Sequence, residues 1–221
     1  MAGEKTLSEE IYEVLYKDIT SQKLKCGQNI TLNELRMRFN VSQTPIREAL
    51  QRLVSDGLLE YYSNKGVKVV DFSEDEIRQI FEFSAELEAT AVLFCGNSFL
   101  KAPMLDELRL CIENEAEALK GHNSSDWDRN AGRIHDVIYK YCGNKYLKEA
   151  ADRMGSRMDL LTTFYDKKDA CEAIHKRHVG VYEAVKNDDF KRAAVLVKEH
   201  LQYSMVEAMK EHTTRRTENN K

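Results

Sequence analysis

Three polar residues, Gln43, Arg47 and Gln51, recur at every fourth position and have the side chains needed to read DNA bases. With this spacing they lie on one face of an α-helix. In the major groove, an arginine can donate two hydrogen bonds to guanine, and a glutamine can pair with adenine. This face therefore predicts sequence-specific contact with DNA, if the flanking residues fold into an element that presents it.

A short helix is predicted just before this face. Thr31 and Glu34 have the spacing of a capping box, which marks a helix start, and Leu35 and Phe39 give an apolar stripe. Asn40 can end the helix because asparagine tolerates the left-handed conformation found beyond many helix ends.

The helix that carries the polar face follows after a tight turn. Either Ser42 or Thr44 can cap it, and Pro45 lies in its first turn, where a missing N–H costs nothing. Gly57 ends it. Its predicted buried face consists of Ile46, Leu50, Leu53 and Val54.

Two short strands are expected next, at 58–62 and 67–70, and the turn at 63–66 joins them into a hairpin. Lys65 would lie near the tip of this hairpin, close to phosphates or a minor groove. Two helices followed by such a wing form a winged helix-turn-helix.

The stretch NVSQTPIREALQRLVSDGLLE resembles the helix-turn-helix of the GntR family of bacterial transcription regulators. The matching residues are Val41, Ser42, Thr44, Pro45, Arg47, Glu48, Ala49, Leu50, Leu53, Gly57 and Leu58. The family usually has arginine at the position of Gln43, so the operator is expected to differ at the base read there. The residues predicted to contact DNA are Arg36, Ser42, Gln43, Thr44, Arg47, Gln51, Lys65 and Gly66.

Two of these positions have a simple alternative interpretation. Arg47 could be a solvated helix charge, although Glu48 already has Arg52 four residues later as a partner. Lys65 could equally be a solvated charge on the wing.

The charge distribution agrees with a specific DNA-binding region rather than a general affinity for polyanions. The whole chain of 221 residues has a net charge of −4. Residues 24–70 contain seven Lys or Arg against four acidic residues, and the remainder is acidic. Such a local basic patch fits operator binding with a salt-dependent phosphate contribution.

The cysteines and the hydropathy predict a soluble cytoplasmic protein. No apolar run approaches the ~20 residues of a membrane span, and no signal peptide opens the chain. The five cysteines are widely spaced, odd in number and without a CxxC pair, which predicts free thiols in a reducing compartment. They are Cys26, Cys95, Cys111, Cys142 and Cys171.

The fold is predicted to be mainly α, with a winged helix-turn-helix domain at 1–72 and an all-helical bundle at 73–221. Thr6 and Glu9 cap a first helix that runs to Gln22 and braces the DNA-binding domain. The bundle is expected to contain six helices, near 73–95, from Pro103 onward, and at 125–141, 145–165, 170–186 and 189–211. The tail at 215–221 is expected to fray.

The bundle resembles the C-terminal FCD ligand-binding domain of FadR-type GntR regulators. The matching features are His135 with Gly143-Asn144, His178 with the apolar residues after it, and His200-Leu201. The resemblance implies a divalent metal held by His135, His178 and His200, and imidazole ligands favour Zn or Ni. Alternatively, the three are ordinary hydrogen-bonded core histidines.

One departure weakens the predicted metal site. Metal-binding relatives usually have an aspartate one turn before the first histidine, where this chain has Ala131; Asn130 and Asp128 are poorly placed to replace it. The remaining histidines, His122, His175 and His212, are assigned to the surface. Alternatively, His175, three residues before His178, lies behind the metal site as a partner of its ligands.

Arg133, Arg153 and Arg157 are candidate clamps for the carboxylate of an effector. The alternative, that each is a solvated helix charge, stays open.

These features together predict a homodimeric regulator that reads a palindromic operator and responds to a small effector, plausibly an organic acid. Two alternatives stay open. One is a metal-dependent enzyme, although the chain has no HExxH and no Gly-rich phosphate loop. The other is a regulator whose bundle only dimerises.

Overall fold

The structure is a computed structural model that describes residues 5–62, 66–121, 127, 130–165 and 170–219. It divides into two compact units. The first comprises Met1–Ser73 with Ser156–Phe164, and the second comprises Glu74–Gly155 with Tyr165–Lys221.

The helices of the first unit begin where their capping residues predict. Thr6 and Thr31 each accept a hydrogen bond from the backbone N–H of the third following residue, Glu9 or Glu34, whose carboxylate bonds back. They precede α1 (Leu7–Thr20) and α2 (Leu32–Phe39). Asn40 ends α2 in the left-handed conformation, with φ of 52°. The helix α1 stops two residues before the predicted Gln22, which itself has a positive φ.

The third helix, α3 (Gln43–Ser55), carries the polar face described above. Ser42 occupies its N-cap position, but the side chain makes no capping hydrogen bond. Ile46, Leu50 and Leu53 are buried as predicted, whereas Val54 is only half-buried.

The sheet contains one strand more than the sequence predicts. β3 (Gly66–Val69) lies between β2 (Leu59–Tyr62) and β1 (Asn29–Ile30), and both pairs are antiparallel. A two-residue strand is too short to produce a recognisable alternation. Gly66 has a φ of +121°, and a Cβ there would lie 2.3 Å from the carbonyl oxygen of Ile30, so only glycine fits. The turn that carries Lys65 lies outside the described residues.

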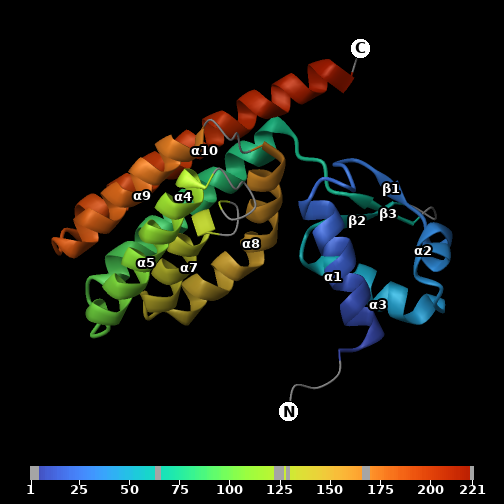
Figure 1. Cartoon of the computed structure of the whole chain (residues 1–221), viewed down its shortest axis with the longest axis horizontal. Helices are drawn as coiled ribbons and strands as arrows, with labels where there is room; N and C mark the ends of the chain where they lie inside the picture. The colour runs from blue at the N-terminus through green and yellow to red at the C-terminus, as the bar shows by residue number, and fades with distance from the viewer. Residues whose placement is uncertain (1–4, 63–65, 122–126, 128–129, 166–169, 220–221) are drawn as a thin grey trace. The chain divides into compact units, whose positions relative to one another are not determined.

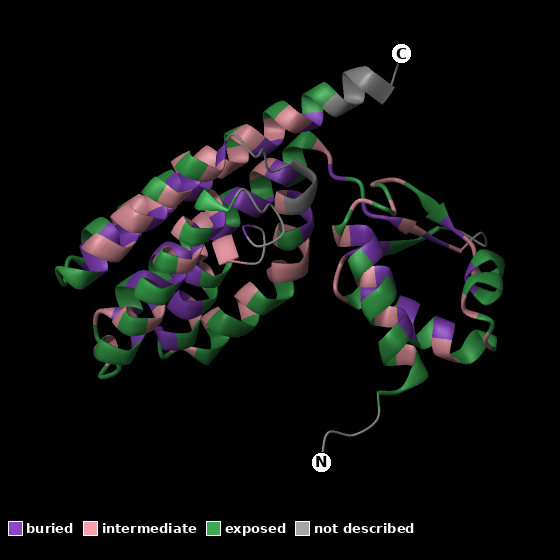
Figure 2. Cartoon of the chain, in the orientation of Figure 1, coloured by how far each residue is buried: buried purple, intermediate pink, exposed green. Residues whose placement is uncertain are grey.

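Five helices of the second unit form a closed ring (Figure 1). α4 (Glu74–Cys95) packs against α10 (Phe190–Asn219), and α10 packs against α9 (Cys171–Lys186). α9 contacts α5 (Lys101–Lys120), α5 contacts α7 (Arg133–Tyr141), and α7 returns to α4. The buried positions face inward, as the purple segments of Figure 2 show.

α8 (Lys145–Tyr165) has the predicted bounds. Gly143, with φ of +68°, follows the end of α7. The Asn144 side chain accepts hydrogen bonds from the backbone N–H groups of Tyr146 and Leu147 at the start of α8. Gly143-Asn144 therefore separates α7 from α8 and also starts α8.

Two helix bounds in the bundle differ from the prediction. The helix α5 begins two residues before Pro103. Near the end of α4, Phe94 is 44% exposed, because the inward stripe of α4 ends on Cys95, 100° further round the helix. The helix α10 reaches Asn219, so the residues expected to fray at 215–219 are helical. The predicted helix start at 125 lies outside the described residues.

The five cysteines are free thiols. Burial raises the pKa of Cys95 to about 12 and that of Cys111 to about 11. Among the described helices, none is both long and apolar enough to cross a bilayer.

Candidate functional site

His135, His178 and His200 meet in the interior of the ring, although they come from three different helices, α7, α9 and α10. Each offers a ring nitrogen, and the three nitrogens lie within 4.8 Å of one another. The ring centroids are 5.4 Å apart for His135 and His178, 5.3 Å for His135 and His200, and 4.4 Å for His178 and His200. Neutral imidazoles at this spacing are a suitable ligand set for a divalent transition metal.

Two buried glutamates contact the cluster. The carboxylate of Glu88 on α4 lies 2.6 and 2.8 Å from Nδ1 of His135. The carboxylate of Glu115 on α5 lies 2.8 Å from Nδ1 of His178 and 3.0 Å from Nδ1 of His175. Each of the five helices in the ring therefore contributes at least one ionisable side chain to this network, and α9 contributes two, His175 and His178.

The hydrogen-bond geometry indicates which nitrogens carry protons. When Glu115 is ionised it can only accept, so the Nδ1–H of His178 donates to it and Nε2 of His178 carries a lone pair. The Nε2 atoms of His178 and His200 are 3.1 Å apart. His200 must then donate from Nε2, and its Nδ1 is left without a partner among the described residues.

The pKa values in the cluster move in different directions. Burial, together with neighbouring histidines, holds the pKa of His178 and of His200 well below the ordinary value, so both are neutral near pH 7. Burial also lowers the pKa of His135, but Glu88 more than offsets this and the net shift is upward. Burial raises the pKa of Glu115 to about 7, against the opposing effect of His175.

The sequence contains a signal that could have identified both glutamates. Glu88 and Glu115 occupy buried positions on the apolar stripes of α4 and α5. A charged residue on such a stripe requires a partner inside the fold. The partners here come from helices far along the chain, so spacing alone does not identify them.

Two surface assignments from the sequence are wrong or incomplete. His212 is 2% exposed, and its Nδ1 lies 3.8 Å from Glu74, because α10 continues past 211, where the last helix was predicted to end. His175 is partly buried and joins the network through Glu115. His122 lies outside the described residues.

The structure does not bring the three candidate arginines to the histidines. Arg133 and Arg153 are exposed and Arg157 is half-buried. In the described part of the chain, no hydrogen bond or ion pair joins any of them to the cluster.

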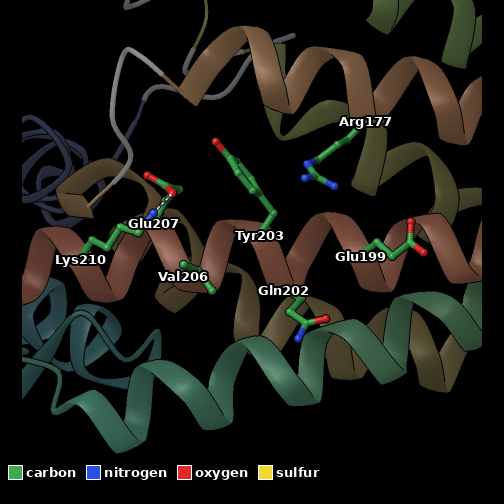
Figure 3. Close-up of a pocket in the computed structure, with 7 residues that line it drawn as sticks. All are labelled: Arg177, Glu199, Gln202, Tyr203, Val206, Glu207 and Lys210. Atoms are coloured by element: carbon green, nitrogen blue, oxygen red, sulfur yellow. Dashed lines mark hydrogen bonds and ion pairs between the residues drawn. The ribbon is translucent and has the colours of Figure 1, made fainter.

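A different arginine, Arg177, acts on the cluster. It precedes His178 on α9, and its charge contributes to the lowered pKa of His200. Its guanidinium lies 4.3 Å from the ring centroid of Tyr203. Figure 3 shows Arg177 of α9 and Tyr203 of α10 extending toward each other at an open groove of about 430 Å³. The groove also contains Glu207, paired with Lys210 at 2.7 Å.

The predicted DNA-reading face is exposed and regular. Gln43, Thr44, Arg47 and Gln51 on α3 are all exposed, as are Arg36 and Ser42. The Arg47 guanidinium lies 3.5 Å from the side-chain oxygen of Gln43, so two of the predicted base readers lie together.

The opposite side of α3 is fixed by α1. Tyr12 on α1 donates to Asp56 at 2.7 Å, beyond the end of α3, and the Arg52 guanidinium stacks 4.0 Å above the Tyr12 ring. Buried Asp18 forms ion pairs with Arg38 and Lys23. The contacts of Tyr12 orient α3, and those of Asp18 join α1 to α2, while the polar face of α3 stays free.

Comparisons with known proteins agree with both halves of this description. Residues 7–69 match the model for bacterial regulatory proteins of the gntR family, and residues 79–203 match the FCD domain. The chain belongs to the GntR family and carries an FCD domain. It is therefore a DNA-binding transcription regulator under effector control, not an enzyme.

Relatives align along most of the chain. The HTH-type transcriptional repressor GlaR of Escherichia coli (strain K12) is 27% identical over 198 residues, which covers 86% of this chain and 90% of GlaR. The HTH-type transcriptional repressor RspR of the same strain is 21% identical over 203 residues, which covers 89% of this chain and 86% of RspR.

Among solved structures, E. coli McbR/YncC has the same fold. Its TM-score is 0.74 at 22% identity, and the match covers 91% of this chain and 96% of that one. A solved metal-free FCD domain matches with a TM-score of 0.55 at 21% identity, over 65% of this chain and 99% of that domain.

The proton positions can be tested in metal-free protein. At about pH 8.5, above the pKa of Glu115, we expect His178 to carry its proton on Nδ1 and His200 on Nε2. Long-range ¹H–¹⁵N correlation spectra of histidine-labelled protein, assigned by single substitutions, report the tautomers. Finding the proton of His200 on Nδ1 would contradict this hydrogen-bond network.

Proposed function

We propose that α3 enters the major groove of the operator and reads it through Gln43, Arg47 and Gln51. The observation that supports this most directly is the exposed polar face of α3, whose other face is buried and braced by α1. Thr44, Ser42 and Arg36 lie around the same helix-turn-helix and position it on phosphates. Lys65 and Gly66 belong to the wing, which tracks the adjacent backbone.

Replacing Arg47 with alanine should weaken binding to DNA sites selected from a random pool by the wild-type protein. Loss of a bidentate contact to guanine costs about 1–3 kcal/mol, or roughly 5- to 150-fold in Kd. The effect should be largest for sites that retain that guanine. Fluorescence anisotropy titrations at one fixed salt concentration measure it.

Lys17→Ala is a suitable control, because it removes the same charge from an exposed position on α1. If Arg47→Ala binds as tightly as Lys17→Ala while both remain folded, α3 does not read the operator in this way.

We propose further that the chain acts as a homodimer on a palindromic operator. A twofold dimer presents two copies of α3 to two half-sites, which is the arrangement that a palindrome requires.

We also propose that His135, His178 and His200 hold a divalent metal, Zn or Ni. The residues present fit such an ion, since three imidazole nitrogens converge and two of the rings have a carboxylate at Nδ1. The ion would supply positions for an anionic effector, plausibly an organic acid. The three histidines would orient it and the surrounding helices would exclude water.

Untagged protein should contain about one metal per chain, and the His178→Ala/His200→Ala variant should contain none. Inductively coupled plasma mass spectrometry after mild zinc loading measures this. His212→Gln is the control, because it removes a buried imidazole elsewhere on α10. A wild-type protein that stays metal-free after loading would leave the histidines as hydrogen-bonding core residues.

An effector at one hundred times its Kd should raise the free energy of unfolding of the zinc-loaded protein by about 2.7 kcal/mol through mass action. Its melting temperature should rise accordingly. Thermal shifts across a panel of small organic acids would identify it, and the shift should disappear in His178→Ala/His200→Ala. If no acid shifts the melting temperature of a folded dimer, the bundle serves only to dimerise.

A further inference from the structure

We propose that Glu88 and Glu115 are positioning residues of the metal site, which turn His135 and His178 toward a common centre and supply the negative charge that balances the ion. This inference rests on the proposed metal site. It assigns a role to two helices, α4 and α5, that contribute no ligand.

The two carboxylates fix the orientation of two imidazole rings. Both oxygens of Glu88 lie within 2.8 Å of Nδ1 of His135, and Glu115 lies 2.8 Å from Nδ1 of His178. In a planar imidazole ring, fixing Nδ1–H on a carboxylate directs the lone pair of Nε2 to the opposite side. The carboxylates therefore select the tautomer and the ring orientation that a metal needs.

A divalent ion at the three histidines would also need negative charge nearby. The three clustered histidines would bind an ion as neutral imidazoles, and no carboxylate belongs to that set among the described residues. A divalent ion in a buried site requires nearby negative charge, because solvent screens it poorly there. The side chains of Glu88 and Glu115 are 4% and 0% exposed, and their carboxyl groups could supply this negative charge next to a bound ion.

Among the described residues, only a protonated histidine could neutralise either carboxylate when no ion is bound. In the part of the chain that the structure describes, their contacts are all with histidines, and no lysine or arginine pairs with them. An uncompensated buried carboxylate is costly. The arrangement is therefore balanced when a doubly charged ion lies between the imidazoles.

His175 gives Glu115 a second anchor. It lies one turn before His178 on α9, and its Nδ1 is 3.0 Å from the other oxygen of Glu115. Glu115 on α5 thus contacts two histidines of α9, and Glu88 on α4 contacts His135 of α7. Both contacts cross between neighbouring helices of the ring.

Glutamine substitutions test the charge with little change of shape. In Glu88→Gln and Glu115→Gln the amide oxygen can still accept from Nδ1–H, but the negative charge is lost. We expect each variant to bind zinc about 10- to 100-fold more weakly than wild type, as is typical for outer ligand partners. Competition with a chromophoric chelator measures the affinity.

Glu107→Gln is the matched control on α5. Glu107 accepts hydrogen bonds from Lys140 and Tyr141, away from the histidines, so this variant should bind zinc like wild type. Two further readouts separate positioning from a structural role. Zinc well above the weakened Kd should restore the wild-type gain in melting temperature, and the absorption spectrum of bound cobalt should shift while three imidazole ligands remain.

Several outcomes would overturn the proposal. If wild type binds zinc and both glutamine variants bind it equally well, the carboxylates are not part of the site, although the metal site itself stands. If wild type binds no zinc, the metal site fails and this inference fails with it. If both variants are unfolded without zinc, the glutamates are structural; if only one is, the other still tests the proposal on its own histidine.

Discussion

The second unit depends on one constraint, which is that five ionisable side chains share a buried interior. Glu88, Glu115, His135, His178 and His200 come one each from the five helices of the ring. A buried carboxylate or imidazole is tolerated only with good partners, so the helices must keep the register that brings these groups together. The apolar stripes supply the packing around this network, but the polar contacts specify which helix faces which.

This arrangement gives regulation a physical basis. A ligand alters DNA binding only if it interacts differently with two states of the protein. A ligand bound at the centre of the ring would contact side chains of α7, α9 and α10 directly. It would act on α4 and α5 through Glu88 and Glu115. Only residues 70–73 separate β3 of the wing from α4, so the chain that leaves the DNA-binding unit enters a helix that belongs to the network.

Local signals made most of the fold predictable, and the site was predictable only in part. The two capping boxes, Asn40 and Gly143-Asn144 act within a few residues, so the sequence identifies the helix ends they set. The long-range partners could not be found in this way. Glu88 and His135 are 47 positions apart, and Glu115 and His178 are 63 apart. The resemblance to FCD domains predicted the three histidines and the missing carboxylate at Ala131. Only the folded helix bundle shows that Glu88 and Glu115 contact Nδ1 of two of the imidazoles.

The three histidines are not equivalent. Binding an ion would require the largest change at His200, because its proton would have to move. His135 and His178 already hold a proton on Nδ1, each against a carboxylate, which leaves Nε2 available. His200 instead uses its Nε2–H to bond Nε2 of His178, so this contact occupies two of the three ligand positions. Binding an ion through both Nε2 atoms requires the proton of His200 to move to Nδ1, which has no acceptor among the described residues. A buried N–H without an acceptor costs about 1–3 kcal/mol. A molecule that offers His200 an acceptor would lower this cost, and would thereby favour the loaded state over the metal-free one.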